Sequence, residues 1–203
     1  SARIAGVATG TTTAGLFSTG TSPTGGGSQT LNESWNGSAW TEVADLNQAR
    51  REGAGSGTTN TAALVFGGRN PPSSATLATN ELWNGSAWTE TGDLNTTRYA
   101  LSGSGSSTAA IAFAGNAPPG KIANTEQWDG SSWTEVNDLA TARASAANGT
   151  VGTSSTSLAS GGDTGSKVAT TEEWTFSGVQ PGDEASYSDA IIGENPPNIL
   201  YLA

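Results

Sequence analysis

Short apolar runs closed by glycine alternate along the chain with stretches of small polar residues. The clearest run is Ala-Ala-Leu-Val-Phe at residues 62–66, and its counterparts lie at 15–17, 110–113 and 157–159. Runs of this length bounded by glycine are typical of buried strands rather than helices. One position in each run holds a large aliphatic side chain, which we expect to be buried: Leu16, Leu64, Ile111 and Leu158.

A hairpin that carries two tryptophans is predicted after each of the first three runs. In the first copy, Glu33-Ser34-Trp35 leads through Asn36-Gly37 to Trp40. Asn-Gly and Asp-Gly pairs favour a two-residue type I′ turn, because both central residues take a positive φ. Such a turn would set Trp35 opposite Ser38 and Glu33 opposite Trp40, with both tryptophans on one face of the sheet. The predicted core on these faces consists of Trp35, Trp40, Trp83, Trp88, Trp128, Trp133 and Trp174.

These features recur in phase four times along the 203 residues. The tryptophans of successive Glu-x-Trp segments are 48, 45 and 46 residues apart. A sheet with one tryptophan-rich face cannot bury that face alone, but it can do so against a copy of itself. We therefore predict an all-β fold in which four-stranded units stack radially as a β-propeller. The predicted units are residues 1–47, 48–95, 96–140 and 141–177, and residues 178–203 form a C-terminal tail.

The fourth copy departs from the others, because no second tryptophan follows Trp174. Its outer strand is either missing or supplied by the tail. Four blades are at the low end of the range for propellers, so three alternatives are open: a small propeller, further blades before Ser1, or completion of the chain in an oligomer. The apolar end of the tail is a candidate for closing the fourth blade or docking on another subunit: Ile199, Leu200, Tyr201 and Leu202.

The order of motifs in each unit resembles a kelch repeat. Trp83-Asn84-Gly85 stands where kelch repeats usually have an aromatic-Asp pair, and Trp88 matches their late tryptophan. The sequence Trp-Asn-Gly-Ser-Ala-Trp-Thr-Glu, followed by Asp-Leu-Asn-x-Ala-Arg, is similar to the Kelch-like repeats of marine phage structural proteins, cyanophage tail and virion proteins among them. The similarity covers about residues 2–193. It implies a β-propeller of Kelch-like blades and a virion or extracellular location.

The composition narrows the possible chemistry. The chain has no Cys, His or Met, which excludes disulfides, Cys/His zinc sites and catalysis by Ser-His-Asp or Cys-His groups. The net charge of −10 argues against nucleic acid or an anionic membrane surface as a partner. No stretch approaches the roughly 20 apolar residues of a membrane span. We expect no cofactor, no nucleic-acid partner and no membrane insertion.

One glutamate in each unit lies on the predicted tryptophan face, and one arginine recurs in the same register. One hypothesis is a ring of carboxylates for acid–base catalysis or cation binding. We favour a structural ladder of buried ion pairs, because an unpaired buried carboxylate is costly. Asp45, Asp93 and Asp138 recur at the joints between units, where turn and capping roles are commoner than metal binding. The ladder consists of Glu33, Glu81, Glu126 and Glu172 with Arg3, Arg50, Arg98 and Arg143.

The loops that precede the Glu-x-Trp segments vary in length from unit to unit. Length variation in a repeat concentrates on one face, which is often the binding face. Unselected drift of surface residues is the alternative explanation. The candidate binding residues in these loops are Pro71, Pro72, Pro118, Pro119, Lys121 and Lys167.

We expect a non-enzymatic structural or adhesive protein of a virion, such as a tail fibre, tail tip or capsid decoration. Its partners would be other virion subunits, copies of itself, or a glycan or protein of the host surface. The virion assignment follows from the resemblance alone. The alternatives are a secreted bacterial carbohydrate-binding propeller module and a glycoside hydrolase that uses two carboxylates. Near-identical units argue against the hydrolase, because catalysis needs one unit with special residues.

Overall fold

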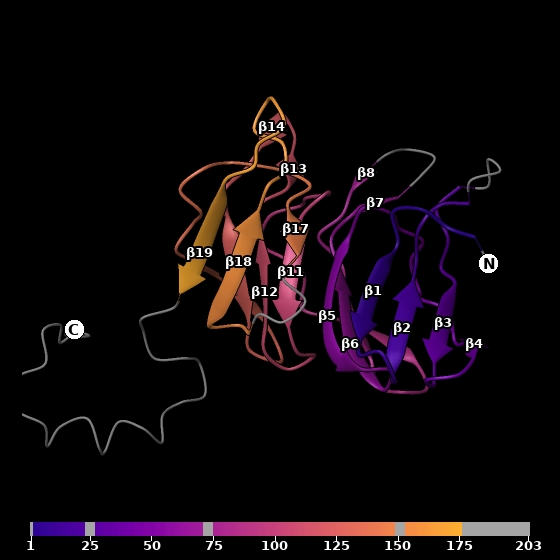
Figure 1. Ribbon diagram of the computed structural model, residues 1–203. Helices are drawn as coiled ribbons and strands as arrows, with labels where there is room; N and C mark the ends of the chain where they lie inside the picture. Colours follow the sequence, from indigo (N-terminus) through magenta and orange to yellow (C-terminus); the bar gives the residue numbers. More distant parts are fainter. Residues whose placement is uncertain (1, 23–26, 71–74, 149–152, 176–203) are drawn as a thin grey trace, which may run out of the picture.

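The fold is all-β (Figure 1). A computed structural model describes residues 2–22, 27–70, 75–148 and 153–175. These residues form antiparallel sheets and contain no helix, so the predicted fold class is confirmed at this level. In particular, the described segments include no helix of the length and apolar character needed to span a bilayer. The predicted docking residues of the tail, 199–202, lie outside the described residues.

Three sheets contain four antiparallel strands each, paired in chain order. The first sheet consists of β1 (Val7–Gly10), β2 (Gly15–Ser18), β3 (Asn32–Trp35) and β4 (Trp40–Val43). The second consists of β5 (Ala54–Thr59), β6 (Ala62–Phe66), β9 (Asn80–Trp83) and β10 (Trp88–Thr91). The third consists of β11 (Ser102–Gly105), β12 (Ala110–Phe113), β15 (Thr125–Trp128) and β16 (Trp133–Val136). Each predicted apolar run thus forms the second strand of its sheet.

The fourth sheet has three strands within the part of the chain that the structure describes. They are β17 (Ala147–Asn148), β18 (Thr156–Ser160) and β19 (Thr171–Thr175). Two short hairpins extend from the loops of the second and third sheets: β7 (Arg69–Asn70) with β8 (Ala75–Thr76), and β13 (Asn116–Ala117) with β14 (Gly120–Lys121). Figure 1 shows both hairpins at the same end of the sheets, uppermost in that view.

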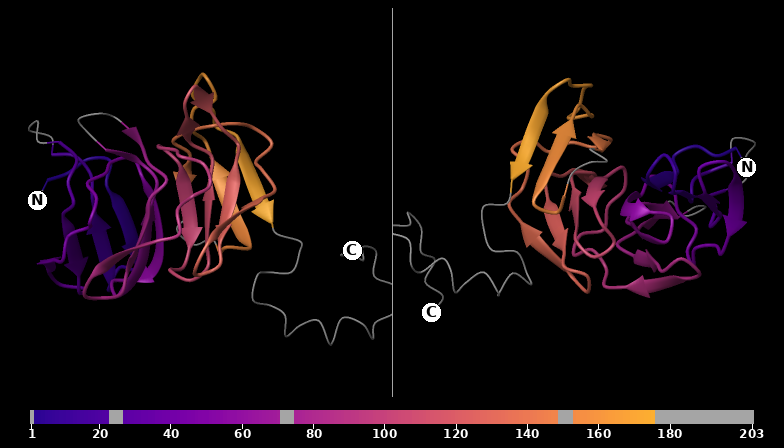
Figure 2. Two further views of the ribbon diagram at one scale, coloured as in Figure 1. Left: turned by 180° about the vertical axis from the view of Figure 1, so that it is seen from behind. Right: turned by 60° about the horizontal axis from the view of Figure 1, so that its bottom comes forward.

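The four sheets follow one another in chain order along an open arc, with the first and fourth at its ends (Figure 2). The inner strands β1, β5, β11 and β17 lie next to one another in that order. Glycine permits this close approach. A Cβ on Gly55 would lie 2.5 Å from Val7 Cγ1, and one on Gly103 would lie 2.5 Å from the ring of Phe66. The small residues of the inner strands are therefore required by packing between sheets.

An apolar cluster fills each of the three interfaces between neighbouring sheets. Between the first and second sheets, Leu16 packs with Trp83 and Trp88. The arrangement recurs at the next two interfaces, with an aliphatic residue against the next tryptophans: Leu64 against Trp128 and Trp133, and Ile111 against Trp174. Each interface therefore joins the aliphatic face of one sheet to the tryptophan face of the next.

Two predicted core residues are exposed, and the prediction of their burial is wrong. Trp40 is 52% exposed and Leu158 is 50% exposed. Trp40 lies on the tryptophan face of the first sheet, and Leu158 lies on the aliphatic face of the fourth. Their equivalents in inner sheets, Trp88 and Ile111, are buried by a neighbouring sheet. The two exposed faces lie at the ends of the arc, where no described sheet covers them.

The tryptophan hairpins have a four-residue loop instead of the predicted two-residue turn. Trp35 pairs directly with Trp40 and does not lie opposite Ser38, so the predicted register is wrong. The Asn36 side chain explains the difference: its Oδ1 accepts hydrogen bonds from the backbone N–H groups two and three residues later, each at 2.9 Å. Only Gly37 of the Asn-Gly pair takes a positive φ. The register shifts by two residues, so both tryptophans still share one face, as predicted.

A series of left-handed residues ties each sheet to the next. Each is the second residue after a recurring arginine, none is glycine, and their φ values lie between 51° and 56°: Ala5, Glu52, Ala100 and Ser145. The N–H of each later member donates to the carbonyl of the previous one, at 3.1, 2.7 and 2.8 Å along the chain. A left-handed backbone costs roughly 1–2 kcal/mol in a residue with a Cβ. The bonds between sheets offset that cost.

Candidate interaction surfaces

Each of the four recurring arginines forms an ion pair with the glutamate of its own unit. In the second unit the pair is fully buried, with Arg50 Nη2 2.7 Å from Glu81 Oε1. Arg50 Nη1 also donates to the carbonyls of Gly67 and Thr79. The other three pairs are Arg3–Glu33, Arg98–Glu126 and Arg143–Glu172. The one-to-one pairing expected from the sequence is therefore present in all four units.

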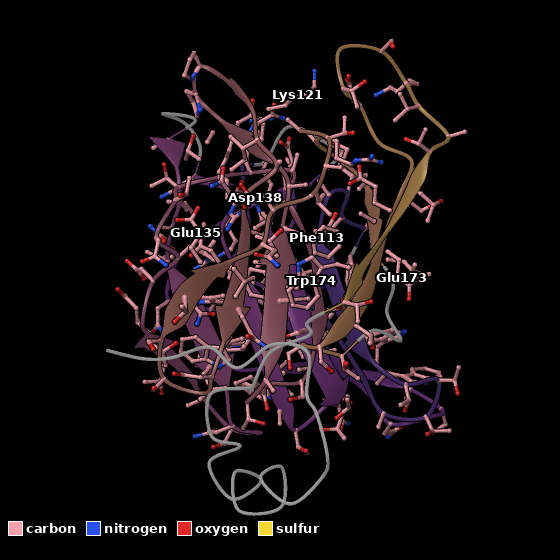
Figure 3. The ribbon with its side chains drawn as sticks, turned by 90° about the vertical axis from the view of Figure 1, so that its left-hand side faces the viewer. Phe113, Lys121, Glu135, Asp138, Glu173 and Trp174 are labelled. Carbon is pink, nitrogen blue, oxygen red and sulfur yellow. The ribbon has the colours of Figure 1, made fainter. Side chains whose placement is uncertain are left out.

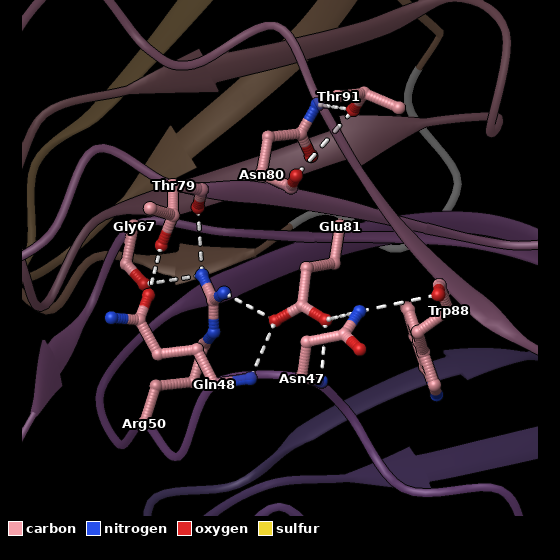
Figure 4. Close-up of polar contacts among 9 residues, drawn as sticks. All are labelled: Asn47, Gln48, Arg50, Gly67, Thr79, Asn80, Glu81, Trp88 and Thr91. Atoms are coloured by element: carbon pink, nitrogen blue, oxygen red, sulfur yellow. Dashed lines mark hydrogen bonds and ion pairs between the residues drawn. The ribbon is translucent and has the colours of Figure 1, made fainter.

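The glutamate also joins its sheet to the preceding one (Figure 4). Glu81 Oε2 accepts the backbone N–H of Asn47 at 2.7 Å and its side-chain amide at 3.0 Å. Glu81 Oε1 accepts the N–H of Gln48 at 3.2 Å. Asn95 and Thr96 donate to Glu126 in the same way. Both carboxylate oxygens thus accept hydrogen bonds from donors of the protein, which is the arrangement that a structural link between sheets requires.

Burial lowers the pKa of the Arg50 guanidinium, and the charge of Glu81 opposes that shift. The same two effects act on the pKa of Arg98, where Glu126 is the opposing charge. In a site that excludes water, the charge of the glutamate therefore offsets the desolvation cost of the charged arginine.

The pairs at the two ends of the arc are less buried than the inner ones. The Glu33 and Glu172 side chains are 21% and 18% exposed, whereas those of Glu81 and Glu126 are 1% exposed. The expectation that all four glutamates are largely buried is thus met most fully in the second and third units.

Two of the recurring aspartates accept hydrogen bonds from threonines earlier in the chain. Asp45 Oδ2 accepts a hydrogen bond from Thr30 Oγ1 at 3.2 Å, and Asp138 Oδ1 accepts one from the N–H of Thr125 at 3.1 Å. Among the residues that the structure describes, no three His, Cys, Asp or Glu side chains gather closely enough to hold a metal ion. The two contacts join residues 15 and 13 positions apart, so they are not the local turn or capping contacts favoured from the sequence.

The described parts of the loops predicted to bind a partner lie along one edge of the sheets, and Lys121 stands near the top of the view in Figure 3. Lys121 Nζ lies 3.1 Å from Asp163 Oδ1, and Lys167 Nζ lies 3.6 Å from Asp163 Oδ2. The N–H of Gly165, followed by Lys121, lowers the pKa of Asp163. Two candidate residues from different units are therefore brought together around one carboxylate.

A second set of contacts stabilises the same edge between the second and third units. Arg69 Nη2 donates to both carboxylate oxygens of Glu52 at 2.7 and 2.5 Å, and its guanidinium lies 3.9 Å from the Tyr99 ring centroid. These three residues carry no repeat signal in the sequence, because each occurs in one unit only. The candidate prolines Pro118 and Pro119 are joined by a cis peptide bond at the tip of the β13–β14 hairpin. Pro71 and Pro72 lie outside the described residues.

A hollow of about 500 Å³ adjoins the exposed tryptophan face of the first sheet. Trp35 and Trp40 line part of it, with their ring centroids 5.4 Å apart. The Trp35 indole N–H donates to the carbonyl of Thr12 at 2.8 Å, which orients the ring. Small and hydroxyl-bearing residues of the inner strands line the rest, including Ser56 and Ser104. The sequence analysis did not predict this hollow, because it placed both tryptophans in the core.

The described part of the chain therefore offers two kinds of surface: an edge of loops joined by ion pairs, and two sheet faces at the ends of the arc that no described sheet covers. In comparisons with known proteins, no family model matches the chain, and no curated protein matches it.

Proposed function

We propose that the chain is a Kelch-like β-propeller scaffold with a non-enzymatic structural or adhesive role in a phage virion. In this role the stacked sheets form a rigid support, and the loop edge carries the contacts with the host surface or with other virion subunits. The propeller and the virion location both extend the resemblance of the Trp-Asn-Gly-Ser-Ala-Trp-Thr-Glu repeats to marine phage structural proteins.

The observation that carries the proposal is the sheet-to-sheet interface that recurs three times. At each interface the tryptophan face packs against an aliphatic face, and a glutamate accepts a backbone N–H from the preceding loop. The recurring glutamates and tryptophans are thereby used to hold the sheets together. Variation between units is concentrated in the loops, as at Lys121, Arg69 and Tyr99. This division supports a scaffold that presents loops.

Mass spectrometry of purified phage particles tests the proposed location. Peptides of this chain should copurify with the particles in stoichiometric ratio to known structural subunits. Peptides that stay in the soluble lysate fraction, with none in the particles, would contradict the virion role. Immunogold labelling of intact particles then shows whether the chain lies on the tail or on the capsid.

A carbohydrate-binding module is a second candidate function, and one observation favours it. Trp40 is half exposed and stands beside Trp35 at a hollow that the exposed residues Thr11 and Thr12 also line. Flat aromatic rings with nearby polar groups suit a pyranose ring, which has an apolar face and hydroxyls at its edge. A glycan array with the wild-type protein and Trp40→Ala tests this: binding that depends on Trp40 supports the module, and an array without binding removes it.

A further inference from the structure

The three interfaces within the chain are built from the same two complementary halves. One half is the aliphatic face, which includes Leu16, Leu64 or Ile111. A leucine from the loop after the sheet completes it, as Leu46 does in the first interface. The other half is the tryptophan face of the next sheet. In all three interfaces a tryptophan face is covered by an aliphatic face, and an aliphatic face is covered by a tryptophan face.

Within the described residues, one copy of each half is not covered by another sheet, and the two copies lie at opposite ends of the arc. The first sheet exposes Trp40 and leaves Trp35 only partly buried, in the position where the second sheet holds buried Trp88 and Trp83. The fourth sheet exposes Leu158, in the position of buried Ile111. These two residues and Ile4 are the large exposed hydrophobic side chains of the described residues.

The backbone shows the same open-ended arrangement. The left-handed residues form a directional series in which each N–H donates to the carbonyl of the previous unit. The series begins at Ala5 and ends at Ser145. A further unit placed before the first sheet would present a carbonyl to the N–H of Ala5, and Ser145 presents such a carbonyl at the other end. The chain thus carries both halves of a fourth interface, in backbone as well as in side chains.

We propose that a second copy of this chain covers the tryptophan face of the first sheet with the aliphatic face of its own fourth sheet, and that two copies close head to tail into one ring. Trp40 of each copy packs against Leu158 of the other. The ring contains two identical interfaces, and its eight sheets lie within the range of four to eight blades known for propellers. The contact is heterologous within each interface, and the two-fold rotation closes it.

A second copy fits better than an unrelated partner for a physical reason. Each internal interface already shows that an aliphatic face of this chain packs to full burial against a tryptophan face of this chain. Tryptophan in a desolvated pocket is also the residue type that most often dominates an interface. The net charge of −10 on each copy opposes association, so moderate salt should strengthen the pairing.

Sedimentation velocity over a series of concentrations tests the proposal with three variants of the full chain. Trp40→Ser removes one half of the interface, and Leu158→Glu removes the other. Ala87→Glu is the matched control, because it adds the same charge at an exposed hairpin tip away from both faces. All three side chains are exposed, so each variant should keep the fold, which circular dichroism verifies.

The wild type and Ala87→Glu should sediment as two chains, and each of the other two variants as one. A mixture of Trp40→Ser with Leu158→Glu should regain a two-chain species, because one intact Trp40 face then meets one intact Leu158 face. A wild type that stays a single chain at all concentrations overturns the proposal, and so do long open assemblies. Loss of pairing in Trp40→Ser but not in Leu158→Glu also overturns it, because tryptophan faces would then pair with each other.

Discussion

Replacement of Trp83 by alanine tests whether the sheets are held together as described. Trp83 is 2% exposed, and its indole N–H donates to the carbonyl of Asn60 at 2.9 Å. A buried tryptophan covers about 150–250 Å², which corresponds to about 4–6 kcal/mol at about 25 cal/mol per Å². Measured losses for Trp→Ala in protein cores are about 3–5 kcal/mol. We expect the free energy of unfolding to fall by that measured amount.

Differential scanning calorimetry measures this loss as a shift of the melting temperature. In a chain of this size each kcal/mol lowers Tm by roughly 2–4 °C, so Trp83→Ala should melt roughly 6–20 °C below the wild type. Trp83→Phe is the control: it keeps an aromatic ring in the interface, loses the N–H donor, and should cost less than Trp83→Ala. A Trp83→Ala protein that melts together with the wild type would refute the packing of the first sheet on the second.

Three further predictions concern the ion pairs, the hairpin loop and the inner strands. Arg98→Met leaves the Glu126 carboxylate buried without its partner and should lower the free energy of unfolding in urea by about 3–5 kcal/mol. Adding Glu126→Leu should recover part of that loss. A double variant that loses as much stability as the two single variants together would argue against coupling between Arg98 and Glu126. The N–H groups of Ser132 and Ser131 lower the pKa of Asp129 from 3.8 to about 2. Because the folded pKa is the lower one, the stabilisation is present above pH 3.8 and is lost as the pH falls through 2. Asp129 is exposed and screened by solvent, so Asp129→Asn should reduce the acid-induced loss of stability by less than about 1 kcal/mol, and identical melting of both proteins from pH 5 to pH 2 would count against the shift. Gly55→Ala should destabilise by about 1–3 kcal/mol, since its Cβ would meet Val7 Cγ1 at 2.5 Å, whereas Gly120→Ala meets nothing within 4 Å and should be nearly neutral; equal effects of the two in urea unfolding would show that the inner strands are not tightly packed.

The repeat made much of the fold predictable from the sequence. Period and hydrophobic pattern identified the strand at residues 62–66 and its counterparts. The ratio of one arginine to one glutamate per unit identified the ion pairs, because only pairing makes a buried carboxylate tolerable. In the third unit Asp129 takes the place of the hairpin asparagine and keeps the loop. Its Oδ1 accepts the N–H groups of Ser131 and Ser132, just as Asn36 Oδ1 accepts the N–H groups two and three residues later in the first unit.

The wrong or missing predictions have a common physical cause. Contacts with adjacent sheets set the burial and backbone conformation of these residues, and the repeated sequence pattern does not contain that information. Trp40 and Leu158 occupy the same positions in the repeat as their buried equivalents, and their place at the ends of the arc exposes them. The left-handed residues Glu52 and Ala100 carry no glycine signal, because hydrogen bonds between sheets impose their conformation. The contact between Arg69 and Tyr99 is likewise specific to one unit and has no period to reveal it.

The bare backbone of the innermost strands sets how sharply the arc bends. Where Gly55 and Gly103 let adjacent sheets nearly touch, a bulkier residue would push the inner edges apart and leave the tryptophan-filled outer edges as they are. The angle between successive sheets would then become smaller, and more sheets would be needed for a full turn. Side-chain size at these few sites therefore controls the angle between successive sheets, and substitutions there can change that angle without altering the aromatic contacts.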